Sequence, residues 1–160
     1  MKSIGVLLLS ATALLAGTSV SAQKITASPS ADYNLFVTEL QSGLQSPWGM
    51  AFLPDKRMLI TQKAGQLLIV SADGKSILAT LGNLPAVASQ GQGGLLDVAL
   101  DPDFAQNKFV YWSYAESGTG REKGLSGTAV ARGRLQGDSL QSIQVIYRQT
   151  PKVNGNGHFG

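Results

Sequence analysis

The sequence predicts an all-β protein built from repeated four-stranded units, and three observations support this fold class. The 160 residues include 19 Gly and 6 Pro but only 14% charged residues, a composition typical of short strands joined by tight turns. Short apolar runs alternate with turn residues along most of the chain. A strand followed by a Pro and Asp turn occurs twice, at Pro54 and Pro102, and 102 − 54 = 48 residues separate the two prolines. A period of about 40–50 residues with four strands per unit is the signature of propeller blades.

The first 22 residues have the features of a secretory signal peptide. Lys2 supplies the positive start, residues 4–16 form an apolar core, and the Val-Ser-Ala sequence that ends at Ala22 is a small-residue cleavage site. The apolar run is shorter than the roughly 20 residues that a membrane span needs, so cleavage is favoured over a stable membrane anchor. We therefore expect a periplasmic or secreted protein, with a flexible leader over residues 23–35. No Cys is present, so no disulfide is needed in that environment.

The first repeat follows the leader. Strands are expected at residues 33–40, 48–53, 57–62, 66–71 and 76–81. Turns separate them at Pro54-Asp55 and at Gly65, and Asp73-Gly74 is the signal of a tight hairpin.

The second repeat shows the same order of strands and turns. Strands are expected at residues 94–100, 108–115, 127–135 and 142–148, with a turn region at 101–107 and a polar loop at 116–126. Trp48 and Trp112 both lie within strand runs, which predicts that they belong to the core rather than to a ligand platform.

A Gly-rich polar loop precedes the strand at 94–100. Gly91, Gly93 and Gly94 allow a tight bend or a close approach of the backbone, and Gln90 and Gln92 are the polar side chains next to them. Such a loop, feeding a rigid strand, can present an amide to a ligand, although a plain turn explains the same residues.

His158 is the only histidine and lies in a Gly-rich segment. Imidazole can exchange a proton near neutral pH, so His158 is a candidate general base; a structural or merely exposed histidine is the alternative. Gly155, Gly157 and Gly160 match a dinucleotide-binding pattern by chance, since no βαβ unit surrounds them. Asp101 and Asp103 are predicted to form a turn.

Several classes of function are excluded or left without support. The residues after Asp103 break the EF-hand pattern, and no metal ligand is assigned. The 13 Lys and Arg residues are scattered rather than clustered in a stripe, so no nucleic-acid partner is expected.

Four motifs in order carry a resemblance to a known family. They are Pro-Trp-Gly-Met-Ala-Phe-Leu-Pro-Asp at 47–55, Gly-Gln-Gly-Gly-Leu-Leu-Asp at 91–97, Asp-Pro-Asp-Phe at 101–104 and Gly-His-Phe-Gly at 157–160. Together they resemble the soluble PQQ-dependent glucose/sorbosone dehydrogenases, and among these the bacterial periplasmic aldose sugar dehydrogenases.

The resemblance implies a six-bladed β-propeller of which residues 36–160 supply about the first two blades, as the N-terminal part of a longer protein. It implies PQQ and Ca²⁺ as cofactors, an aldose substrate and an external electron acceptor. His158 would take the proton of the sugar C1 hydroxyl, Gln92 would contact the substrate end of the site, and residues 36–40 would close the ring. The residues that clamp PQQ and bind calcium lie in later blades, so we expect the 160 residues alone to be inactive and poorly folded.

Two departures from the family pattern stand out. Thr61-Gln62-Lys63 replaces a common Thr-Glu-Arg, which removes any bidentate ion pair there, and Gly157 replaces an Asn or Asp before the histidine. Two other functions remain open on the same fold: a calcium-dependent lactonase or esterase, and a non-catalytic propeller that binds carbohydrate or protein.

Overall fold

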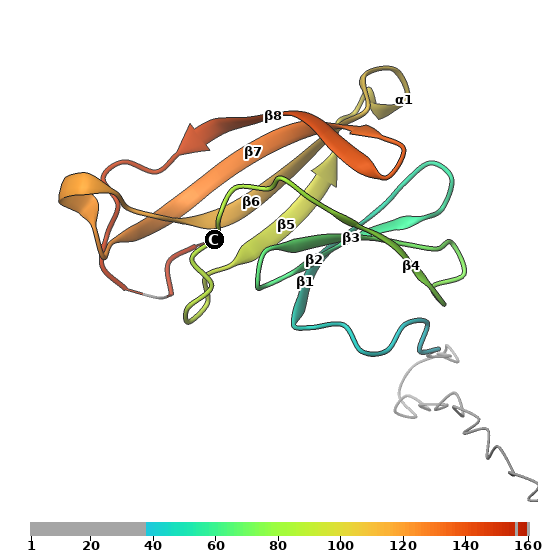
Figure 1. Cartoon of the computed structure of the whole chain (residues 1–160), viewed down its shortest axis with the longest axis horizontal. Helices are drawn as coiled ribbons and strands as arrows, with labels where there is room; N and C mark the ends of the chain where they lie inside the picture. Colours follow the sequence, from blue (N-terminus) through green and yellow to red (C-terminus); the bar gives the residue numbers. More distant parts are fainter. Residues whose placement is uncertain (1–37, 156, 160) are drawn as a thin grey trace, which may run out of the picture. The chain divides into compact units, whose positions relative to one another are not determined.

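Eight strands in the described part of the chain form two four-stranded antiparallel sheets (Figure 1). The computed structural model describes residues 38–155 and 157–159. The predicted signal peptide, the leader and residues 36–37 of the ring-closing strand lie outside them. Residues 38–40 form no strand with the other described residues, and the ring-closing role stays a prediction. Both sheets belong to one compact unit, Leu40–Gly160.

The first sheet corresponds to the first predicted repeat and has the strand order β1-β2-β3-β4. Its strands are β1 (Pro47–Phe52), β2 (Met58–Gln62), β3 (Gln66–Val70) and β4 (Ile77–Leu81). The turn between β3 and β4 contains the predicted Asp73-Gly74 pair. The Asp73 carboxylate accepts hydrogen bonds from the Ser71 hydroxyl at 2.6 Å and the Lys75 N–H at 3.1 Å, which closes the hairpin.

The second sheet corresponds to the second repeat and has the order β5-β6-β7-β8. Its strands are β5 (Leu95–Leu100), β6 (Phe109–Ser117), β7 (Ser126–Gln136) and β8 (Ser139–Arg148). Two short helical turns, α1 (Phe104–Asn107) and η1 (Gly120–Glu122), lie within the predicted turn region and polar loop. Strand β6 continues two residues beyond its predicted end, because it stays in register with β7 as far as the pair Ser117 and Ser126.

The Asp-Pro-Asp turn after β5 is a hydrogen-bonded structure, as predicted. One oxygen of the Asp101 carboxylate accepts from the Asp103 N–H at 2.9 Å and the Asn107 amide at 2.7 Å, and the other accepts from the Tyr111 hydroxyl at 2.8 Å. The bond from Asn107, followed by those from Asp103 and Tyr111, holds the pKa of Asp101 below its ordinary value. Both carboxylate oxygens of Asp101 therefore accept hydrogen bonds that hold the turn.

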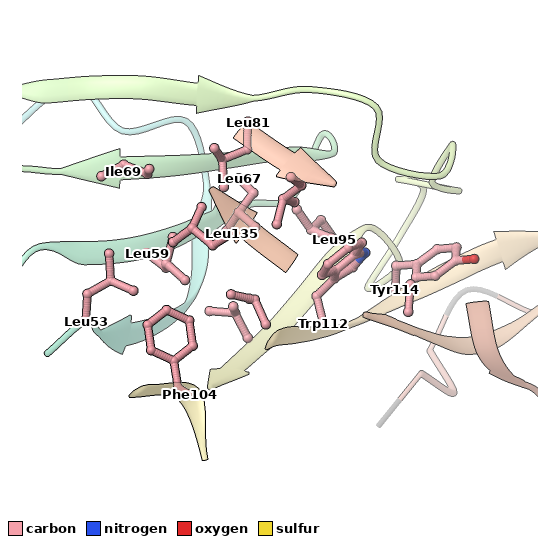
Figure 2. Packing of buried hydrophobic residues seen from close by; sticks show 14 of the residues in the cluster. Leu53, Leu59, Leu67, Ile69, Leu81, Leu95, Phe104, Trp112, Tyr114 and Leu135 are labelled. Atoms are coloured by element: carbon pink, nitrogen blue, oxygen red, sulfur yellow. The ribbon is translucent and has the colours of Figure 1, made fainter. Parts of the chain in front are cut away.

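The main hydrophobic core lies between the two sheets (Figure 2). The first sheet contributes the fully buried Leu59 and Leu67, and the second contributes Leu95, Trp112 and Tyr114. Trp112 is 1% exposed, which confirms its predicted place in the core. Both sheets share one apolar cluster, so each covers a face that the other would otherwise expose to water.

A polar joint at Thr61 complements this core. The fully buried Thr61 hydroxyl donates to the Leu96 carbonyl at 2.6 Å and accepts from the Gly49 N–H at 2.8 Å, linking β1, β2 and β5. Gly49 is needed here, since a Cβ on it would lie 2.7 Å from the Asp97 carboxylate and 2.9 Å from its Cα. The joint thereby brings the start of β5 against the first sheet.

Candidate functional site

A pocket of about 480 Å³ lies where β1 and β5 begin. Its lining residues are Trp48, Gln92, Leu96, Asp97, Ser113 and Phe159. The predicted Gly-rich loop contributes Gln92 and the C-terminal segment contributes Phe159. The side chain of Gln92 also approaches Gly157, where a Cβ would lie 3.4 Å from Gln92 Oε1. The structure therefore brings together the two loops that carry the predicted site residues.

The loop that carries Gln92 is held by the end of β2. The Lys63 ammonium donates to the Gly91 carbonyl, and the Lys63 carbonyl accepts from the Leu95 N–H at 3.0 Å. Gly94 permits this approach: its φ is +146°, and a Cβ on it would lie 2.3 Å from the Lys63 carbonyl oxygen. Lys63, which replaces the arginine common in the resembling family, thus holds the loop from the first sheet at Gly91 and at Leu95, on either side of Gln92.

His158 is half-buried beside the start of β7. Its Nε2 lies 3.2 Å from the Ser126 carbonyl oxygen. A carbonyl can only accept a hydrogen bond, so a neutral ring in this contact has its proton on Nε2 and its lone pair on Nδ1. Gly155 lies on the Nδ1 side of the ring, where even a Cβ would come only to 3.5 Å. Among the residues that the structure describes, none makes a hydrogen bond to Nδ1 of His158.

Phe159 anchors the end of the same segment. Its ring is 6% exposed, packs with Leu96 and Ala115, and lies 4.3 Å from the imidazole of His158 between centroids. Phe159 also lines the pocket, so the imidazole packs against a lining residue, whereas His158 itself does not line the pocket.

A cluster of charged residues lies next to the segment that precedes His158. Glu116, at the end of β6, accepts from Arg148 at 2.9 Å and from Lys152 at 2.8 Å. Burial alone would raise the pKa of Glu116, but the bonds from Lys152 and Arg148 outweigh it and hold the pKa below its ordinary value. Burial, together with the negative charge of Glu116, raises the pKa of Tyr114 to about 12, so Tyr114 stays a neutral donor.

Sequence reasoning did not predict Trp48, Asp97 or Ser113 as pocket residues, and it misplaced Trp48. Trp48 was predicted to belong to the core, but it is 55% exposed, because it lies with Met50 and Phe52 on the face of β1 that the described residues leave largely open. Alternation along residues 48–52 was the available signal. Asp97 and Ser113 carried no such signal, since only strand pairing brings Ser113 Oγ to the Asp97 N–H, at 3.2 Å.

Neither a cluster of metal-ligating side chains nor a membrane-spanning helix occurs in the described ranges. No group of three or more His, Cys, Asp or Glu side chains there could hold a metal ion. Residues 38–155 and 157–159 also contain no helix long and apolar enough to cross a membrane.

Comparisons with known proteins agree with the motifs. A family model described as Glucose / Sorbosone dehydrogenase matches residues 44–160. The aldose sugar dehydrogenase YliI of Escherichia coli (strain K12) is 46% identical over 127 residues, which cover 78% of this chain and 33% of that protein.

Solved structures give the same result. The soluble aldose sugar dehydrogenase from Escherichia coli, in the apo-form, matches with a TM-score of 0.67 and 44% identity over 73% of this chain and 33% of that one. The PQQ-bound aldose sugar dehydrogenase from Streptomyces coelicolor matches with a TM-score of 0.60 and 28% identity over 70% of this chain and 33% of that one. The chain therefore spans about a third of the length of these relatives.

Proposed function

The chain belongs to the glucose/sorbosone dehydrogenase family, and from this premise we propose that the full-length protein containing it oxidises the C1 hydroxyl of aldose sugars to lactones. PQQ is the proposed cofactor, as in the PQQ-bound relative. The two sheets are proposed to be two neighbouring blades of a six-bladed propeller, with the site at the end of the blades where β1 and β5 begin.

One observation carries the proposal: the convergence of Gln92 and the His158 segment, which are 158 − 92 = 66 residues apart in the sequence. In the structure Gln92 and Phe159 line one pocket, whose volume lies in the range of about 300–1,000 Å³ typical of small-molecule sites.

The chemistry assigned to His158 is proton transfer. Nε2 already carries the proton that it donates to the Ser126 carbonyl, so Nδ1 would take the proton of the C1 hydroxyl. The resulting imidazolium would keep its bond to Ser126, whose carbonyl dipole favours the positive ring. PQQ, when bound, supplies the acceptor for the hydride that leaves C1, so that C1 and its oxygen become a carbonyl group.

The other pocket residues fit the substrate edge of such a site. Gln92 and Ser113 offer hydrogen-bond donors, and the exposed indole of Trp48 offers a flat apolar surface to a ring. The Asp97 carboxylate would repel the carboxylates of PQQ, so the cationic groups that bind them are proposed to come from other parts of the full-length protein. The same holds for the ligands of the proposed Ca²⁺ ion, since the described residues supply no such cluster.

We further propose that the protein works in the periplasm or outside the cell and passes its electrons to an external acceptor. The signal-peptide pattern of residues 1–22 supports this location. The measurement that checks it is the N-terminal sequence of the mature protein, expected to begin at Gln23.

The test of the function is aldose-dependent dye reduction by the full-length protein reconstituted with PQQ and Ca²⁺. His158→Gln, which keeps a polar side chain of similar size but no base, is expected to lower kcat by about 10²-fold or more. Lys75→Gln, in an exposed turn, is the matched control and should retain wild-type activity.

Two outcomes would distinguish the role of His158 from the function of the whole protein. An active His158→Gln enzyme would keep the family function and remove His158 as the base. A wild-type protein that binds no PQQ would overturn the proposal and favour the lactonase or binding-module alternatives.

A further inference from the structure

Lys152 is an unusual residue for its position, because its side chain is only 7% exposed. Lysine is almost never buried unless it is paired, since an ammonium removed from water loses most of its hydration. Here both the ammonium and the backbone N–H of Lys152 bind a carboxylate. Its Nζ lies 2.8 Å from Glu116 Oε2, and its backbone N–H donates to Glu122 Oε1 at 3.0 Å.

Glu116 is the centre of this cluster. One of its oxygens accepts from the Arg148 guanidinium at 2.9 Å and from the Tyr114 hydroxyl at 3.2 Å, and the other accepts from Lys152. One carboxylate therefore joins the end of β6, the end of β8 and the segment that follows β8.

A short chain of contacts connects Lys152 to His158. The next residue, Val153, pairs with Ser126 through two backbone hydrogen bonds of 3.0 Å. The Ser126 carbonyl that accepts from the Val153 N–H also accepts from His158 Nε2. A shift of Lys152 would move Val153 along Ser126 and disturb the oxygen that orients the imidazole.

We propose that Glu116 and Lys152 are positioning residues that hold Val153 in register with Ser126, so that His158 keeps its Nε2–H on the Ser126 carbonyl and presents Nδ1 to the substrate. This inference rests on the proposed function, because it assumes that His158 acts as the base. Neither residue lines the pocket that Gln92 and Phe159 share, so both act through His158 and not through contact with the sugar.

The experiment uses the full-length protein and the variants Lys152→Met, Lys152→Arg and Glu116→Gln. Lys152→Met is expected to lower kcat by about 10- to 100-fold, the scale of a misplaced catalytic group, with KM within about threefold of wild type. Lys152→Arg retains the positive charge and should restore most of kcat. In the PQQ-free protein, amide hydrogen exchange of residues 149–155 should become faster in Lys152→Met.

Arg57→Met is the matched control. Arg57 is also partly buried and paired with carboxylates, Asp55 and Asp138, but it lies in the turn between β1 and β2, away from the His158 segment. It should leave kcat, KM and the exchange of residues 149–155 unchanged.

Each result decides a separate point. Wild-type kcat in Lys152→Met, a rise in KM alone, or unchanged exchange at 149–155 would overturn the inference. If Lys152→Met does not fold, Glu116→Gln decides by the same three measurements. A wild-type protein without dehydrogenase activity would overturn the proposed function and the catalytic part of this inference, whereas exchange in the PQQ-free variants would still test the anchoring.

Discussion

The two loops that form the candidate site are held by different forces. The Gln92 loop is fixed between the sheets, where the Lys63 backbone approaches Gly94 and the Lys63 ammonium binds Gly91. The His158 segment is fixed within the second sheet, by a buried ion pair and by the shared carbonyl of Ser126. Steric fit therefore controls the first loop, whereas charge controls the second. The first should be sensitive to added atoms and the second to pH.

The largest expected effect is steric. Gly94→Ala would place a Cβ 2.3 Å from the Lys63 carbonyl oxygen, and its φ of +146° disfavours any side chain. We expect a loss of about 3 kcal/mol or more in the free energy of unfolding, measured by chemical denaturation of the full-length protein.

Gly137→Ala is the control for that substitution. Gly137 also has a positive φ, +55°, but no atom lies within 4 Å of its would-be Cβ. Its cost should be only about 1 kcal/mol, from backbone strain alone. Equal losses in the two variants would show that the close approach to Lys63 does not hold the first loop.

The second-largest expected effect is electrostatic and concerns the His158 segment. Glu116→Gln removes the charge that Arg148 and Lys152 bind, and should lower the free energy of unfolding at pH 7 by about 1.5–3 kcal/mol, the range for hydrogen bonds to charged groups.

The direction in which this stabilisation changes with pH follows from the pKa of Glu116. The pKa of Glu116 is lowered in the folded protein from its ordinary value of 4.5, so the folded state favours the carboxylate. This stabilisation is complete well above pH 4.5 and is lost as the pH falls through the lower, folded-state pKa. Urea denaturation of wild type and Glu116→Gln at pH 7 and pH 3 should give a smaller difference at pH 3. A difference independent of pH would show that the charge of Glu116 does not hold the segment.

The smallest expected effect tests the Lys63 ammonium, which binds the Gln92 loop from the first sheet. Lys63→Met removes the bond to the Gly91 carbonyl but keeps the backbone contact with Leu95. We expect a loss of about 0.5–1.5 kcal/mol in the free energy of unfolding, and a rise in KM for the aldose because Gln92 is less well placed. Lys63→Arg should behave like wild type. A fall in kcat without a change in KM would mean that the Gln92 loop acts on the chemical step instead.

The fold was predictable to the extent that it depends on local patterns. The Asp73-Gly74 hairpin, the Asp101 turn and the burial of Trp112 follow from residue types that favour one conformation over short distances. The ends of β6 and the exposure of Trp48 were not predictable. They depend on the register with β7 and on which face of β1 other elements cover, and both arise only when the strands pair and pack.

The sequence by itself determined the strand-and-turn order, the two four-stranded repeats and the candidate residues Gln92 and His158, because short-range preferences and recognisable motifs encode all of these. Only the tertiary structure decided that the two loops meet at one pocket, that Lys63 secures the first, and that Glu116 and Lys152 secure the second. Glu116 and Lys152 are 36 residues apart in the chain, and nothing in the sequence distinguishes either of them from an ordinary charged surface residue. Their pairing follows from the packing of β6, β7 and β8, which removes water from around the ammonium and leaves the carboxylate as its partner.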